Sequence, residues 1–154
     1  MLFRSKNNDW SREHNVTDKF VVLYSGTLGL KHNPSLLTNL AKRFSHQDDF
    51  LLLVVSEGLG ADWIQKEIIT QKISNLLLLP FQPFTDLPKL LGSADILLTI
   101  LEPEAGVFSV PSKVLTNFCS SRAQVLSCPE NNLAARNLIE QNAGIVTKDR
   151  KSVV

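Results

Sequence analysis

Four segments of the sequence follow short apolar runs and carry residue types that could hold a ligand. They read SGTLGLKHNP from residue 25, SEGLGAD from residue 56, PFQPFTD from residue 80 and EPEAGVFSVPSK from residue 102. Backbone amides at glycine turns and helix starts suit anions, lysine adds positive charge, and aromatic side chains stack on planar rings. These residue types could contact an anion or a planar ring.

The first segment is a candidate for a diphosphate contact. Gly26 and Gly29 stand between a predicted strand and the helix that Asn33 or Pro34 would open, and Lys31 adds a positive charge nearby. The segment is neither GxGxxG nor a Walker loop, because it lacks a third glycine and a GK[ST] ending. By itself it also fits a plain tight turn with a solvated lysine.

The second and third segments give weaker indications of a ligand. SEGLGAD is typical of a turn followed by a helix cap at Asp62, with no ligand required. In the third segment, Pro80 and Pro83 favour an extended stretch that carries Phe81 and Phe84. An aromatic side chain in such a loop either stacks on a planar base or is pinned to the core.

The fourth segment combines acidic residues with a helix start. Pro111 favours helix initiation at Ser112. The free amides of that helix would point toward a ligand, with Ser109 and Ser112 as hydroxyl donors and Lys113 as a cation. The alternative is that serine and proline merely cap the helix and the glutamates are solvated.

Composition excludes several classes of function. The 154 residues suit one domain, and a net charge of +1 gives no strong field toward nucleic acid or an acidic membrane. The apolar runs are far shorter than the roughly 20 residues of a transmembrane segment, and the N-terminus lacks the apolar core of a secretory signal. Cys119 and Cys128 have no CxxC partner for a metal and are predicted to be buried, unpaired thiols.

Alternating strands and helices must position the four segments. Continuous apolar runs predict buried strands at 20–26, 50–56, 76–79, 94–100, 124–127 and 144–146. Helical spacing joins the apolar residues Val114, Leu115, Phe118 and Cys119, with comparable sets at 36–44, 63–68 and 133–139. The prediction is an α/β fold: a doubly wound, Rossmann-like parallel sheet of five or six strands over residues 20–154, after a polar lead-in over 1–19. The four segments would then meet beyond the carboxyl ends of the strands, where such sheets bind ligands.

Three stretches and a C-terminal segment carry a resemblance over residues 18 to about 147. They read DKFVVLYSGTLGLKHNPSLL, FQPFTDLPKLLGSADILL, VPSKVLTNFCSSRAQVLS and NLIEQNAGIV. Together they resemble the C-terminal, nucleotide-sugar-binding domain of retaining GT-B glycosyltransferases of the group 1, family 4 type. That family includes capsule, exopolysaccharide and colanic-acid transferases. The resemblance implies that this chain forms one half of a GT-B fold.

The resemblance also implies roles for individual residues. Those that would contact the donor diphosphate and sugar are Gly26, Thr27, Lys31, Glu104, Gly106, Phe108, Ser109, Ser112, Lys113 and Thr116. The nucleotide base would lie against Phe81 and Gln82. The implied reaction moves a sugar from a UDP- or GDP-sugar to an acceptor hydroxyl, with retention at the anomeric carbon, in polysaccharide or glycoconjugate synthesis. Positive charge and amides would stabilise the leaving diphosphate, so no metal or other cofactor is expected. The catalytic side chains are not identified.

The implied partner is an N-terminal acceptor domain or polypeptide, because GT-B enzymes bind donor and acceptor between two domains. We therefore expect this chain alone to bind a nucleotide-sugar without turnover. The predicted location is the cytoplasm, either free or peripheral at the inner face of the membrane through the missing domain.

The chain departs from the commonest family pattern at two places. Thr116 stands where many members have a glutamate that holds the donor ribose, a feature shared by the subgroup that reads PSKLTN. Ser121 and Ala123 replace a glycine and a proline. Two alternatives therefore stay open: a non-catalytic partner-binding module derived from this domain, and half of a nucleotide-sugar epimerase. The epimerase gains little support, since His32 is the one histidine in a candidate loop.

Overall fold

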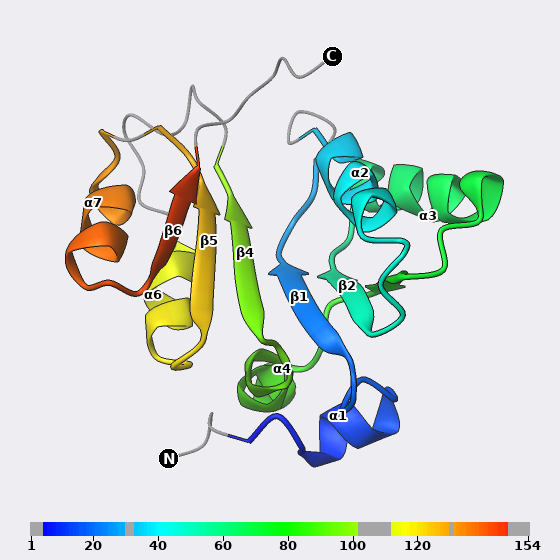
Figure 1. The fold of residues 1–154 in the computed structure, drawn as a ribbon, viewed down its shortest axis with the longest axis horizontal. Coiled ribbons are helices and arrows are strands. Elements are labelled where there is room, and N and C mark those ends of the chain that lie inside the picture. Colours follow the sequence, from blue (N-terminus) through cyan, green and yellow to red (C-terminus); the bar gives the residue numbers. More distant parts are fainter. Residues whose placement is uncertain (1–4, 30–32, 102–111, 130, 148–154) are drawn as a thin grey trace.

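The computed structural model describes residues 5–29, 33–101, 112–129 and 131–147, and these form one six-stranded parallel sheet with helices on both faces (Figure 1). The strands are β1 (Phe20–Ser25), β2 (Phe50–Val55), β3 (Leu76–Leu79), β4 (Ile96–Ile100), β5 (Ala123–Ser127) and β6 (Gly144–Thr147). Their order across the sheet is β3-β2-β1-β4-β5-β6, and every neighbouring pair is parallel. The predicted doubly wound α/β fold is confirmed, with six strands.

Helices occupy the segments between the strands, as the spacing of apolar residues predicts, and a short helix also precedes β1, where the sequence predicts only a polar lead-in. They are α1 (Asp9–Glu13), α2 (Ser35–Arg43), α3 (Leu59–Gln71), α4 (Leu87–Ser93), α6 (Ser112–Phe118) and α7 (Leu133–Glu140), with a 3₁₀ turn, η2 (Phe84–Asp86), before α4. α3 begins at Leu59, so Asp62 lies in its first turn instead of capping it. None of the described helices has the length and apolar character needed to cross a membrane.

Alternate strand residues separate two apolar layers. Val22 and Tyr24 of β1 pack with α2 and α3 on one face, where Leu37 of α2 is fully buried. Leu23 of β1 points to the opposite face and packs with Leu90 of α4. This alternation is the two-residue period of a strand that is covered on both sides.

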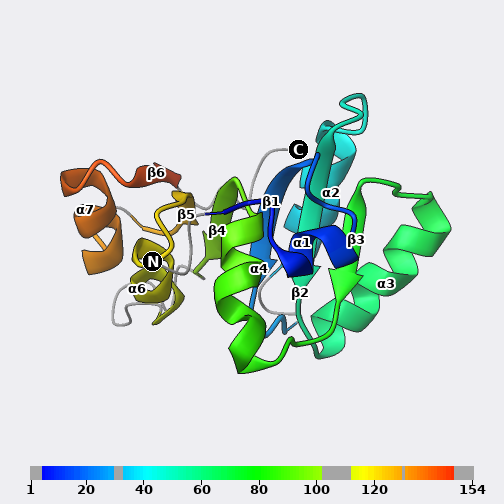
Figure 2. The same cartoon turned by 90° about the horizontal axis from the view of Figure 1, so that it is seen from below.

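The helices α6 and α7 lie on the same face as α4. Val114 of α6 and Leu138 of α7 pack with Leu126 of β5. The strand register places Leu126 beside Thr99, two residues beyond Leu97, which belongs to the α4 layer. Figure 2 shows α6 and α7 beside β5 and β6, and α2 and α3 at the other end of the molecule. Right-handed crossovers that leave β1 in opposite directions produce this division of helices.

Residues 5–19, predicted from composition as a polar lead-in, carry apolar side chains that pack on the α4 face. Trp10 and Val16 are buried in the same layer as Leu90. Asn8 caps α1 by accepting a hydrogen bond from the Ser11 amide at 3.0 Å, and Ser11 Oγ accepts one from the Asn8 amide at 2.9 Å. This capping box lets a five-residue helix form beside α4.

The α6 helix begins at Ser112, where the sequence predicts a helix start, but it is buried on one side only. Val114 and Asn117 face the sheet, whereas Leu115 is 57% exposed. Val114 and Asn117 are three residues apart and share a face, while Leu115 is turned about 100° from Val114. The spacing that groups Leu115 with Val114 on one apolar face, and so predicts that Leu115 packs on the sheet, is therefore wrong for Leu115, and a buried asparagine lies on the sheet-facing side.

Burial of the two cysteines was predicted correctly for one of them. Both thiols are unpaired, and Cys128 is fully buried. Cys119 is exposed, because it lies one residue beyond α6 and four residues from Leu115, on the same outer side of that helix. Its thiol lies 3.6 Å from the Leu115 carbonyl oxygen.

Candidate functional site

The site lies at the point where the chain reverses its direction across the sheet. The order β3-β2-β1-β4-β5-β6 places β1 and β4 side by side, with the next strands added outward on both sides. Their register joins Val22 to Ile96 and Tyr24 to Leu98, and no further pair follows. The two strands therefore separate at their carboxyl ends. A crevice at this position is where open α/β sheets bind ligands.

A pocket of about 140 Å³ lies in this crevice. Its polar wall is formed by Ser25, Thr99, Ser112, Lys113, Thr116 and Asn117. Its apolar wall is formed by Leu23, Leu87, Leu91, Leu97 and Leu98. Strand ends from β1 and β4, the helix α4 and the first turns of α6 thus all contribute. The structure brings together three of the predicted sugar- and diphosphate-binding residues here: Ser112, Lys113 and Thr116.

Lys113 lines the pocket, and its side chain extends to Tyr24 at the end of β1. Its Nζ atom lies 4.9 Å from the centroid of the Tyr24 ring, over the ring face. Burial lowers the pKa of Lys113 from its ordinary value, since a desolvated ammonium group loses hydration energy. Within the described residues, no carboxylate pairs with this ammonium group. An anionic ligand in the pocket would therefore meet a cation that these residues leave unneutralised.

Gly26 is required where Lys113 crosses the end of β1. Its φ is +141°, a backbone conformation that side chains disfavour. A Cβ atom added to Gly26 would fall 2.0 Å from Lys113 Nζ. The amide of Gly26 donates to the Val55 carbonyl at 2.9 Å, and the neighbouring Thr27 carbonyl accepts from Tyr24 Oη at 3.3 Å. The predicted residues Gly26 and Thr27 thus lie beside Lys113 and Tyr24.

Asn117 and Thr99 join α6 to β4 at the pocket wall. Both residues are buried, and Asn117 Nδ2 donates to Thr99 Oγ1 at 3.4 Å. Thr116, the neighbour of Asn117, is exposed, and its hydroxyl donates to the Ser112 carbonyl at 3.4 Å. The helix therefore places the hydroxyl-bearing residues Ser112 and Thr116 at the pocket, while the side chain of Asn117 is bonded to β4.

A second hollow of about 230 Å³ adjoins the first. Its lining residues are Ser25, Val55, Phe81, Gln82, Phe84, Leu87 and Leu90, and Ser25 and Leu87 also line the first pocket. Phe81 is 45% exposed and Phe84 is 86% exposed. Aromatic rings with open faces beside an apolar hollow can stack on a planar ligand. The hollow thus contains both predicted base-contact residues, Phe81 and Gln82.

Gln82 has a structural contact in addition to its place in this hollow. Its Oε1 atom accepts a hydrogen bond from Trp10 Nε1 at 3.1 Å, and its Nε2 atom donates to the Pro80 carbonyl at 3.0 Å. The amide of Phe81 donates to Glu57 Oε1 at 3.1 Å. Both ends of the Gln82 side chain are therefore engaged within the protein.

Five of the predicted site residues lie outside the described residues: Lys31, Glu104, Gly106, Phe108 and Ser109. Three polar residues that line the hollows are missing from the prediction: Ser25, Thr99 and Asn117. Phe84, for which the sequence allows either base stacking or packing on the core, lines the second hollow. Ser25 and Thr99 lie near the ends of predicted strands, so the sequence pattern could have identified them as site candidates. The sequence pattern could not have identified Asn117, because its side of the helix was predicted to be apolar.

A third hollow lies away from these residues. It measures about 460 Å³ and is lined by Phe118, Arg122, Ala123, Gln124, Asn142, Ala143, Gly144 and Ile145. These residues gather at the amino ends of β5 and β6, and no predicted site residue is among them. Although this hollow is larger, the crevice at the carboxyl ends is the better candidate, because loops and charge converge there. Within the described part of the chain, no three His, Cys, Asp or Glu side chains are grouped as a metal site would need.

Comparisons with known proteins support the fold. No protein-family model matches the sequence, and a search of curated proteins finds no match. Solved structures do match. The glycosyltransferase from Rickettsia africae ESF-5 has 16% identity over 92% of this chain, with a TM-score of 0.71. Anabaena HepE, solved with UDP, has 17% identity over 98% of this chain and a TM-score of 0.71.

A third similar structure is itself a single domain. The C-terminal domain of the group 1 glycosyltransferase LpcC from Francisella tularensis has 12% identity over 97% of this chain and 78% of that domain, with a TM-score of 0.65. By contrast, this chain spans 37% of the Rickettsia protein and 42% of HepE. The shared feature is the fold, which corresponds to one part of these longer glycosyltransferases.

Proposed function

We propose that this chain is the nucleotide-sugar donor-binding domain of a retaining GT-B glycosyltransferase. The observation that carries the proposal is the position of Lys113, whose ammonium group lies over Tyr24 and beside Gly26 in the crevice between β1 and β4. The shared fold with glycosyltransferases, one of which was solved with UDP, supports the same function. The ligand would be a UDP- or GDP-sugar used in polysaccharide or glycoconjugate synthesis.

The two adjoining hollows suit the two ends of such a ligand. The diphosphate and sugar would lie in the first pocket, against Lys113 and the hydroxyl groups of Ser112 and Thr116. The base would lie in the second, against Phe81 and Phe84. Ser25 lies between the two hollows because it lines both. Lys31, Glu104, Gly106, Phe108 and Ser109 remain part of the proposed site on the family resemblance alone.

In the proposed reaction, this domain binds the donor and stabilises the departing diphosphate. Departure of the nucleoside diphosphate leaves negative charge on its phosphate oxygens, and Lys113 would stabilise that charge without a bound metal. A transferase also needs groups that bind and orient the acceptor hydroxyl. We propose that an N-terminal acceptor domain or polypeptide supplies them, so that this chain alone binds the donor without turnover.

Titration calorimetry of the 154-residue chain with UDP, GDP and their sugars tests donor binding. We expect saturable binding to one nucleotide, weakened about tenfold or more by Lys113→Ala, because a charge-assisted phosphate contact is lost. Lys66→Ala, on the exposed side of α3, is the matched control and should leave affinity unchanged. Absence of binding to every nucleotide-sugar would overturn the proposal and favour a partner-binding module.

Ser121, which prompted the partner-module alternative, lines neither hollow. It lies in the turn between α6 and β5. Its replacement of a family glycine therefore bears on the backbone of that turn and leaves the proposed donor contacts intact.

A further inference from the structure

The loop that carries the two exposed phenylalanines is held in place by other parts of the chain. We call residues 80–84 the aromatic loop. Its first bond joins the Phe81 amide to Glu57 Oε1 at 3.1 Å. Its second joins Trp10 Nε1 to Gln82 Oε1 at 3.1 Å, across 72 positions of sequence. Gln82 Nε2 then donates to the Pro80 carbonyl at 3.0 Å and folds the side chain back on the loop.

Trp10 is a firm anchor for this bond. The residue is 4% exposed and belongs to the apolar layer that contains Leu90 and Leu91 of α4. Its ring stacks on His14, with centroids 3.9 Å apart and planes 13° apart. Since the ring is packed on these sides, the direction of its N–H group is fixed by the core.

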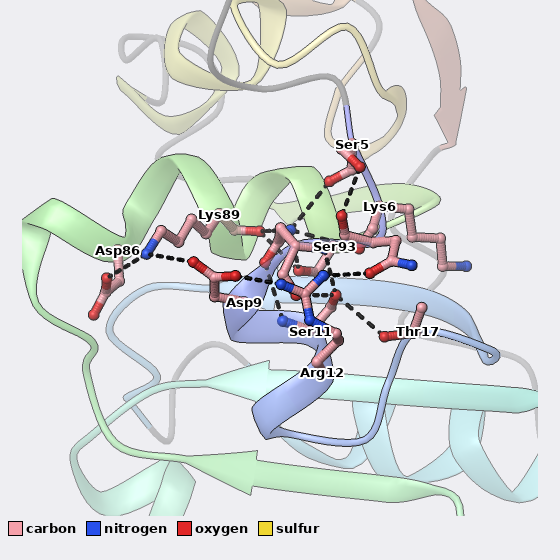
Figure 3. A network of polar contacts seen from close by, with 11 residues as sticks. Ser5, Lys6, Asp9, Ser11, Arg12, Thr17, Asp86, Lys89 and Ser93 are labelled. Atoms are coloured by element: carbon pink, nitrogen blue, oxygen red, sulfur yellow. Dashed lines mark hydrogen bonds and ion pairs between the residues drawn. The ribbon is translucent and has the colours of Figure 1, made fainter.

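Polar contacts also hold α1 on α4. Asn8 Nδ2 donates to the Lys89 carbonyl at 3.0 Å and to Ser93 Oγ at 3.1 Å. Lys89 Nζ lies 3.9 Å from Asp9 of α1 and 4.0 Å from Asp86 of η2, so it stands between the two elements (Figure 3). The segment that presents Trp10 and the segment that follows Phe84 are thus fixed to the same helix.

We propose that Trp10 is a positioning residue for the base of the donor nucleotide, acting through Gln82 on the aromatic loop. This inference rests on the proposed function, because the hollow beside the loop is taken as the base site. The bond to Glu57 restrains the Phe81 amide, and the indole hydrogen bond restrains the next residue, Gln82. Together they limit the motion of the backbone that carries the Phe81 ring. A fixed loop binds a planar base better than a loose one, because less conformational entropy is lost on binding.

Packing and positioning make different demands on Trp10. The core needs an aromatic ring at this place, whereas the positioning role needs the N–H group. Trp10→Phe keeps a ring and removes the donor. Gln82→Met keeps the length of the partner side chain and removes both the acceptor for Trp10 and the donor to the Pro80 carbonyl. Trp63 of α3 packs against the layer on the opposite face, so Trp63→Phe is the matched control for a tryptophan truncation in this protein.

Calorimetric titration with UDP and GDP on these variants gives the first readout. We expect Trp10→Phe and Gln82→Met each to weaken binding about three- to tenfold, the scale of one lost hydrogen bond. The double variant should bind no more weakly than the weaker single variant, because Trp10→Phe has no hydrogen bond left to break once Gln82 is methionine. Trp63→Phe should stay within about twofold of the wild type. Equal effects of the Trp10 and Trp63 changes, or independent losses in the double variant, would overturn the proposal.

Amide hydrogen exchange gives a readout that does not depend on nucleotide binding. Trp10→Phe and Gln82→Met should speed exchange at the Phe81 amide about three- to tenfold, since the loop opens more often. Trp63→Phe should not change it. If the wild type binds neither nucleotide but this exchange pattern is seen, the proposed function is wrong, whereas the conclusion that Trp10 and Gln82 restrain the aromatic loop is supported. If exchange at Phe81 is unchanged, Trp10 does not position the loop, whatever the protein binds.

Discussion

Lys113 is the residue at which burial, charge and position combine in the candidate site. Burial lowers its pKa below the ordinary value of 10.5. Between the lowered pKa of the folded protein and 10.5, the unfolded chain binds more protons than the folded chain. The contribution of Lys113 to stability therefore rises with pH in that window, since the cost of burying its charge is relieved.

This linkage predicts a pH-dependent difference between the wild type and Lys113→Met. The stability of the wild type relative to the variant should increase as the pH rises through the lowered pKa toward 10.5. Nucleotide affinity of the wild type should fall in the same window, because a neutral amine no longer attracts a diphosphate. Urea unfolding and calorimetry across a pH series measure the two trends. Parallel pH curves for the two proteins would contradict the assignment of the shift to Lys113.

Gly26 and Lys113 should act as one unit in binding. Gly26→Ala places a methyl group where Lys113 Nζ lies, and the flexible lysine must move away. We expect a loss of about 1–3 kcal/mol in stability from the strained backbone, and a loss of nucleotide affinity close to that of Lys113→Ala. Combining Gly26→Ala with Lys113→Ala should weaken binding little further, as a double-mutant cycle would measure. Full additivity in the cycle would show that Gly26 contacts the ligand independently of the lysine.

At the scale of elements, the turn between α6 and β5 carries strain. Ser121 has a φ of +57°, in the left-handed region that side chains disfavour. The family resemblance places glycine at this position, and the observed backbone gives the physical reason. The turn returns the chain from α6 into β5, beside β4.

Ser121→Gly should therefore stabilise the protein. Relief of left-handed strain outweighs the added freedom of glycine in the unfolded chain, and we expect a gain of about 0.5–1 kcal/mol. Thermal or urea unfolding measures the change. Nucleotide affinity should be unchanged, since Ser121 lines neither hollow. A loss of stability in this variant would indicate that the serine side chain has a structural role.

At the scale of the whole molecule, the two halves of the sheet meet at the candidate site. β1 and β4 are paired through fewer residues than β1 and β2 or β4 and β5. Lys113 of α6, in one half, lies at Tyr24 of β1, in the other half. A ligand in the crevice would contact both halves and should stabilise the folded state as a whole. Ligand binding and unfolding are therefore linked.

We expect the nucleotide that binds to raise the melting temperature of the chain by about 5–10 °C at a hundredfold excess over its Kd. Scanning calorimetry or a thermal shift series checks this value. Lys113→Ala should need a proportionally higher nucleotide concentration for the same shift. A shift of the same size with inorganic phosphate alone would indicate that the base hollow contributes nothing.

The sequence alone predicts the class of the fold and places the candidate site residues at the ends of strands and helices. Continuous apolar runs such as 50–55 specify strands buried on both faces, and their alternation with helical spacing leaves few topologies. The same pattern places Gly26, Phe81 and Lys113 at strand or helix ends, so their convergence follows from the sheet. These features were predictable because they depend on local periodicity.

Which side chains meet, and which contacts hold them, depends on the tertiary structure. The exposure of Leu115, the burial of Asn117 against Thr99 and the bond from Trp10 to Gln82 all depend on how helices pack on the sheet. The two contacts join residues of separate elements, which the periodicity of a single element does not relate. Periodicity also leaves open which of several neighbouring residues on a helix face the sheet. The sequence therefore predicts which segments could meet a ligand, and packing decides which side chains line the candidate site and what holds them in place.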